Sequence, residues 1–312
     1  MTVWPDLYRV RAASACEIPS PSEGAHAHES LDQYQAQRQT IRQLPQAVAA
    51  CASAACQSMA GGIGDRVTLS MGTLHGTRYV GQLMSLILQT SGMSGLDPLL
   101  FVYYSPQVVT AVVSQGLGIS GETCTLVGET ADLQAFQAGT RLLFLGRSDL
   151  AIVGAWDFPE LIVEYGCEEV SSPAIAIPGT SQILIIDRPP PLGSTAEDAV
   201  GYTSRPRWIA PNDVTATAIS SLVKNEWGMP LDTITEVYVQ HSLGINMSAV
   251  IKACEHLGCS EINVCSQSGL HALGTMKNLM ETEPCGRWLI ISERADGGCL
   301  ITLNTGREAF KR

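Results

Sequence analysis

Residues 117–156 read LGISGETCTLVGETADLQAFQAGTRLLFLGRSDLAIVGAW and contain a complete strand–turn–helix–strand unit. The β-branched and apolar run 124–127 predicts the first strand, and 128–132 is a turn of small and polar residues. Large apolar side chains then recur at helical spacing over 133–145, and a Gly-Arg-Ser-Asp sequence ends that helix. The apolar run 150–154 predicts a second buried strand.

The turn between the first strand and the helix is the place where this unit could carry chemistry. Backbone N–H groups at a helix N-terminus have no partner within the helix, so they favour an anion or a developing negative charge. The turn offers Glu129, Thr130 and Asp132 but no thiol. The nearest cysteine, Cys124, lies upstream at the start of the strand.

The segment resembles the nucleophile segment of β-ketoacyl synthases, which have the thiolase fold. Active members carry a TACAS-type turn that places a cysteine at the start of the helix. Counted back from Leu133, the cysteine position falls on Glu129; counted forward from Gly121, it falls on Thr130, because the turn is shorter in this chain. The sequence LVGETADLQAF more closely resembles the VAEQAGGLDAL turn of chain-length factors, the catalytically silent partners of ketosynthases in type II polyketide systems.

The resemblance also implies where the other groups of a condensing enzyme would lie. Such an enzyme forms an acyl thioester on cysteine and decarboxylates a malonyl unit with two hydrogen-bond donors from its second half. His241 in VYVQHSLG resembles the first donor and His271 in SQSGLHALG the second, but no HGTGT or HQAN pattern follows. The ADGG sequence at 295–298 resembles the GFGG turn, with Asp296 replacing phenylalanine.

The resemblance therefore predicts no catalytic residue, but a degenerate site at Glu129, Thr130, His241 and His271. For the two histidines, a role as core residues at strand ends is an equal alternative.

Chain-length factors pair with an active ketosynthase, and the resemblance implies the corresponding interface here. It would be formed by Cys124, Thr125, Leu126 and Val127 and the flanking helices. In that family bulky side chains near the interface limit the pocket into which the polyketide grows. The candidates in this chain are Met84, Leu88, Phe101 and Tyr104, for which ordinary core or dimer packing is the alternative.

The second half of the chain appears as a repeat of the first. The strand-like run 234–240 before His241 echoes 67–71 before Gly72, and INVCSQSGLHALGTMKNLM followed by WLIIS echoes the opening segment. A duplicated α/β half predicts parallel strands covered by helices on both faces. Repeat and resemblance together indicate an α/β thiolase fold with a duplicated five-layer αβαβα architecture. The Pro-rich hinge 188–192 divides it into halves 1–190 and 191–312.

The N-terminal region gives weaker signals. Residues 1–35 show no clear secondary-structure pattern, and 8–12 is a candidate edge strand. Residues 30–59 predict helix, which Pro45 should divide into two. Within it, CASAAC at 51–56 imitates the ketosynthase nucleophile motif, but no strand leads into it, so buried core cysteines are expected. The sequence predicts neither a metal site nor a cofactor: Cys254 and Cys259 lack CxxC spacing and a second pair.

Composition limits the remaining possibilities. The 312 residues carry a net charge of −11, which disfavours nucleic acid and anionic membranes as partners. Only 16% of residues are charged, so a partner is expected to cover part of the surface. The apolar runs fall short of the roughly 20 residues that span a bilayer. The N-terminus lacks a signal-peptide pattern, and the ten cysteines suggest reduced thiols in the cytoplasm.

These observations predict a non-catalytic ketosynthase-like subunit. It would form a heterodimer with a catalytic ketosynthase, meet the acyl carrier protein through that complex, and shape the acyl tunnel of a type II polyketide or fatty-acid-like pathway. The alternative is a cysteine-less enzyme that decarboxylates malonyl-carrier or transfers an acyl group. A third possibility is a homodimer of the same fold with a binding role only.

Overall fold

A computed structural model of the chain describes residues 7–18, 31–59, 63–158, 179–188, 199–227, 234–240, 247–259, 261–265, 272–294 and 296–310. The elements of the first half are β1 (Leu7–Ile18), α1 (Leu31–Gln57), β2 (Val67–Thr73), α2 (Arg78–Ser91), η1 (Met93–Gly95), α3 (Leu99–Tyr103), α4 (Gln107–Leu117), β3 (Thr123–Val127), α5 (Ala131–Phe144), β4 (Leu150–Asp157) and β5 (Gly179–Asp187). Those of the second half are β6 (Gly201–Ser204), β7 (Arg207–Ile209), η2 (Pro211–Asp213), α6 (Ala216–Ser221), the π-helical η3 (Leu222–Glu226), β8 (Glu236–Gln240), α7 (Met247–Leu257), β9 (Glu261–Cys265), α8 (Ala272–Thr282), β10 (Arg287–Glu293), β11 (Cys299–Gly306) and α9 (Arg307–Phe310).

The described strands form one 11-stranded sheet in which the internal repeat is visible. The order is β3-β2-β4-β5-β1-β6-β11-β10-β8-β9, with β7 paired to β11. In the first half β2 pairs parallel with β3 and β4, and β5 runs antiparallel between β4 and β1. In the second half β8 pairs parallel with β9 and β10, and β11 runs antiparallel between β10 and β6. The expectation of parallel strands is therefore right for three strands of each half and wrong for the rest.

The N-terminal strand is not at an edge, which corrects the expectation for residues 8–12. β1 pairs with β5 on one side and with β6 on the other, and so joins the strands of the two halves. Arg9 and Arg11 of this strand both contact Asp187 of β5. Arg9 does so through two hydrogen bonds, of 2.9 and 2.5 Å. The paired charges explain how a basic strand lies inside the sheet. The predicted boundary near residue 190 falls in 189–198, outside the described residues.

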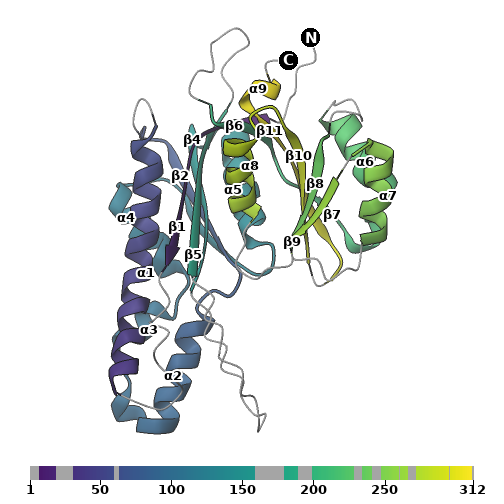
Figure 1. Cartoon of the computed structure of the whole chain (residues 1–312). Helices are drawn as coiled ribbons and strands as arrows, with labels where there is room; N and C mark the ends of the chain where they lie inside the picture. Colours follow the sequence, from purple (N-terminus) through teal and green to yellow (C-terminus); the bar gives the residue numbers. More distant parts are fainter. Residues whose placement is uncertain are drawn as a thin grey trace.

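Helices cover the sheet in three layers, and each layer has its own core. Figure 1 shows α1 and α4 outside the strands of the first half, α5 and α8 between the two sets of strands, and α6 and α7 outside the second. Strand β4 illustrates why both faces are apolar: Ile152 packs in the α1 core, whereas Val153 packs in the α5–α8 core. This arrangement is the expected five-layer αβαβα architecture.

Helix α1 also differs from the expectation. It continues through Pro45 instead of dividing there. Leu44 and Val48, on either side of the proline, are fully buried in the core beneath the helix. Packing of this apolar face against the sheet therefore keeps one helix where local propensity favours two.

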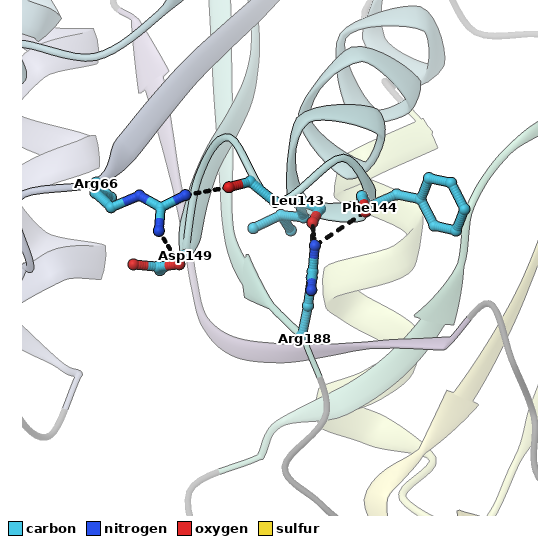
Figure 2. A network of polar contacts seen from close by, with 6 residues as sticks. Arg66, Leu143, Phe144, Asp149 and Arg188 are labelled. Atoms are coloured by element: carbon cyan, nitrogen blue, oxygen red, sulfur yellow. Dashed lines mark hydrogen bonds and ion pairs between the residues drawn. The ribbon is translucent and has the colours of Figure 1, made fainter.

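Helix α5 of the central layer is fixed at its C-terminal end by two arginines (Figure 2). Arg188, directly after β5, donates to the carbonyl oxygens of Leu143 and Phe144, the latter at 3.0 Å. Arg66, directly before β2, donates to the carbonyl of Gly146 and lies 3.5 Å from Asp149. Both guanidinium groups donate to carbonyls at or just after the C-terminal end of the helix and oppose the negative end of its dipole.

At its N-terminal end α5 is fixed by a buried carboxylate. Asp132 is 3% exposed; one carboxylate oxygen accepts from the N–H of Leu133 at 2.7 Å, the other from Ala272 at 2.5 Å. Ala272 is the first residue of α8, so this side chain links the N-terminal ends of the two central helices. Negative charge is favourable at both positions, because the N-terminus of a helix is the positive end of its dipole.

We expect Asp132→Asn to lower the free energy of unfolding by about 1–3 kcal/mol. An asparagine oxygen can accept only one of the two N–H groups, and its NH₂ group would face the other. Urea unfolding followed by circular dichroism measures the change. The matched control is Glu281→Gln in the i,i+4 pair with Lys277 of α8, which should cost about 0.5 kcal/mol or less. Equal stability of wild type and Asp132→Asn would contradict the linking role of the carboxylate.

Candidate functional site

The turn between β3 and α5 lies at the C-terminal ends of two parallel strands. Its first residue, Gly128, has φ +137°, a backbone conformation that favours glycine. The Gly128 N–H donates to the carbonyl of Thr73, the last residue of β2, at 3.0 Å. The N–H of Ala131 in turn donates to the Gly128 carbonyl at 3.1 Å. The turn is thus held by backbone hydrogen bonds against the end of β2.

A close approach between β2 and α5 leaves little room for the turn to move. A Cβ atom built on Gly72 would lie 2.3 Å from the carbonyl oxygen of Ala131. Any larger residue at 72 would therefore have to push the start of α5 away from the sheet. Gly139 has the same effect further along the helix, because a Cβ there would lie 2.8 Å from Val153.

The two candidate nucleophile positions differ sharply in exposure. Glu129 has an exposed side chain, whereas Thr130, the N-cap of α5, is fully buried. The Thr130 hydroxyl accepts a hydrogen bond from the side-chain amide of Gln134 at 2.8 Å. An amide N–H is not a general base, so this contact does not activate the hydroxyl for attack.

The cysteines nearest in sequence and pattern do not supply the missing thiol. Cys124 of β3 donates to the hydroxyl of Ser70 on β2 at 3.2 Å, within the sheet rather than in the turn. Cys51 and Cys56 of the CASAAC sequence are buried in the core under α1. The hydrogen bond from Cys16 lowers the pKa of Cys51 to about 7, and burial raises the pKa of Cys56 to about 11. Both cysteines lie on α1 and are buried in the hydrophobic core that this helix covers, as expected for structural cysteines.

The second-half donors predicted from the sequence, His241 and His271, lie outside the described residues. The neighbouring ADGG turn is described in part. Asp296 accepts from the N–H of Gly298 at 2.9 Å and pairs with Arg294 at 3.1 Å. The Arg294 guanidinium lies 5.2 Å from the centre of the Trp208 ring. Arg294, Trp208 and Asp296 therefore form a cluster at this turn.

A cavity of about 610 Å³ lies next to the turn, at the N-terminus of α2. His75, Thr77, Tyr104 and Val127 are among its lining residues. Of the tunnel candidates, Tyr104 thus lines the cavity, with its ring against Gly81, while Met84, Leu88 and Phe101 do not. Leu88 and Phe101 are 41% and 55% exposed, and Met84 is half-buried against the α1 core. Their role in a tunnel stays a prediction.

Strand β3, with the predicted interface residues, forms one end of the sheet and β9 forms the other. Val127 is 53% exposed, while Cys124, Thr125 and Leu126 are half-buried. Within the described part of the chain, no group of three or more His, Cys, Asp or Glu residues has the geometry to hold a metal ion. No described helix is long and apolar enough to cross a membrane.

Comparison with solved structures places this arrangement in a known fold. The ishigamide ketosynthase/chain length factor matches with a TM-score of 0.67 at 10% identity, over 96% of this chain and 99% of that chain. The AntDE:AntF structure, a type II PKS acyl-carrier protein in complex with its ketosynthase bound to the hexaketide, matches with a TM-score of 0.68 at 12% identity, over 97% and 100%. Ketosynthase twelve of the bacillaene polyketide synthase from Bacillus amyloliquefaciens matches with a TM-score of 0.64 at 10% identity, over 97% and 76%.

The chain has the ketosynthase form of the thiolase fold. No protein-family model and no curated protein matches it by sequence, so the likeness is one of fold.

The β3–α5 turn offers the exposed carboxylate of Glu129 and the buried, hydrogen-bonded hydroxyl of Thr130. Asp132 was visible in the sequence as part of the turn, but its contact with Ala272 depends on a residue 140 positions away. The cluster around Trp208 was not foreseen. The sequence RPRW at 205–208, basic and aromatic within a few residues, was the signal that could have indicated it.

Cysteines introduced at the two turn positions will decide which of them faces solvent. We expect the thiol in Glu129→Cys to be alkylated at least as fast as the exposed native Cys285, because the helix N-terminus favours the thiolate. We expect the thiol in Thr130→Cys to react roughly 100-fold more slowly, since it becomes accessible only on local opening. Iodoacetamide labelling followed by peptide mass spectrometry measures both rates against Cys285. Faster labelling at 130 than at 129 would reverse the assignment.

Proposed function

We propose that this chain is a non-catalytic ketosynthase-like subunit of the chain-length-factor type. Its role is to pair with a cysteine-containing ketosynthase and to shape the space in which the acyl or polyketide chain grows. The observation that supports this most is the β3–α5 turn, where Glu129 and Thr130 stand in place of a thiol. Thr130 is buried and hydrogen-bonded to Gln134, so the turn lacks the nucleophile–base pair on which covalent acyl transfer depends.

Apolar surface beside β3 supports the pairing. Large hydrophobic side chains are exposed on β3, on α2, and on or directly after α3, and two of them, Tyr104 and Val127, line the cavity at the N-terminus of α2: Leu88, Leu99, Phe101, Val102, Tyr104 and Val127. Exposed apolar side chains of this size on adjoining elements are typical of a surface that a partner covers. An edge strand in the same region offers unpaired backbone groups for a partner strand.

The carrier protein would reach this subunit through the complex. One solved structure of the same fold contains an acyl-carrier protein with its ketosynthase. This chain has a net charge of −11, so direct docking of an acidic carrier on most of its surface is unfavourable. We therefore assign the main carrier contact to the catalytic partner.

A charge introduced on β3 tests the proposed interface. We expect Val127→Asp to abolish co-purification with a cysteine-containing ketosynthase encoded beside this chain, because burying an unpaired carboxylate in an interface costs several kcal/mol. Val264→Asp on β9, the strand at the opposite end of the sheet, is the matched control; Val264 is 49% exposed and should leave pairing intact. Equal loss in both variants, or in neither, would count against the β3 interface.

An activity assay separates the proposed role from the alternative enzyme. The purified chain alone should neither condense nor decarboxylate a malonyl-thioester, and the complex should condense only with the partner's cysteine intact. Malonyl decarboxylation by the chain alone that is lost in Glu129→Gln would support the cysteine-less enzyme. Condensation by the chain alone would end the silent-subunit proposal.

A further inference from the structure

A second cavity, of about 730 Å³, opens between α5, the segment that leads into β7, and the end of β10. Four arginines line it: Arg141 from α5, Arg205 before β7, Arg207 at the start of β7, and Arg294 directly after β10. Among the described residues that line the cavity there is no carboxylate, while Arg294 pairs with Asp296, which is not a lining residue, at 3.1 Å. In a chain with a net charge of −11, such a cluster creates a local positive field.

The segment that carries two of these arginines is anchored on both sides. The side-chain amide of Gln137 on α5 donates to the carbonyl of Pro206 at 3.0 Å. On the other side Trp208 is paired with Leu300 in the ladder between β7 and β11. The Trp208 ring also packs on Gly298, where an added Cβ would lie 2.3 Å from the ring. These contacts fix this wall of the cavity, so the wall is preorganised for a ligand.

Two of the four guanidinium groups also lie over aromatic rings. The Cζ atom of Arg205 lies 5.0 Å from the centre of the Phe144 ring, and that of Arg294 lies 5.2 Å from the centre of the Trp208 ring. Stacking fixes the plane of a guanidinium while its N–H donors point outward in that plane. Arg141 forms no ion pair or side-chain hydrogen bond with any described residue. The cavity thus combines two arginines that lie over aromatic rings with a third, Arg141, that has no counter-charge among the described residues.

We propose that this cavity binds an organic phosphate. Guanidinium groups match the oxygens of a phosphate in bidentate geometry, and several of them can share one multiply charged group. Leu126, Leu222 and Trp208 line the same cavity and provide apolar surface for the organic part of the ligand. Its volume lies within the range of small-molecule sites, about 300–1,000 Å³. The assignment does not depend on the proposed pairing with a ketosynthase.

Calorimetric titration with inorganic pyrophosphate, ADP and citrate at one ionic strength tests the assignment on the purified chain, or on its complex if the chain requires a partner. We expect saturable binding of pyrophosphate and tighter binding of ADP, which also offers an apolar ring. Arg141→Gln and Arg205→Gln should each weaken ADP binding roughly 10-fold to 100-fold, as expected for the loss of a charge-assisted hydrogen bond. Rising salt should weaken binding further.

Arg42→Gln is the matched control. Arg42 lines a separate surface cavity of about 540 Å³ together with Arg38, and pairs with Asp97. It should leave ADP affinity within about twofold of wild type, and circular dichroism with thermal melting verifies the fold of every variant. Absence of saturable binding by pyrophosphate and ADP would overturn the proposal. So would equal affinity of wild type and a folded Arg141→Gln, or citrate binding as tight as that of pyrophosphate.

Discussion

The buried carboxylate of Asp132 is the contact on which the central layer depends. The N-terminal ends of α5 and α8, which come from different halves of the chain, lie on either side of this carboxylate. Each end presents backbone N–H groups and the positive end of its helix dipole to it. Without a negative group between them, these two ends would repel each other in a region that excludes water. Asp132 turns that repulsion into two short hydrogen bonds, and so fixes α5 relative to α8.

The geometry of the β3–α5 turn follows from this placement. The start of α5 is held by Asp132 on one side and by close backbone contact with Gly72 on the other. Its far end is held by Arg188 and Arg66. A helix fixed at both ends presents whatever residue stands at its N-terminus in one defined position. In this chain Glu129 and Thr130 stand at that N-terminus.

The local sequence pattern was sufficient to predict the secondary structure of residues 117–156. It was insufficient where contacts with residues far along the chain determine the structure. The predicted strand, helix and strand of 117–156 are observed as β3, α5 and β4 within a few residues, because each has a strong periodicity of its own. Strand β1 was misjudged because Arg9 and Arg11 look like surface residues until Asp187, far along the chain, is placed between them. The four arginines of the second cavity are likewise gathered only by the fold.

The position of β1 has a consequence for how the protein is made. Both neighbours of this strand, β5 and β6, are synthesised long after it; Arg9 and Asp187 are 178 positions apart. The seam between the halves therefore cannot close until most of the polypeptide has been synthesised. Until then β1 has two unpaired edges that are available to other chains, so the nascent protein should depend on chaperones during translation.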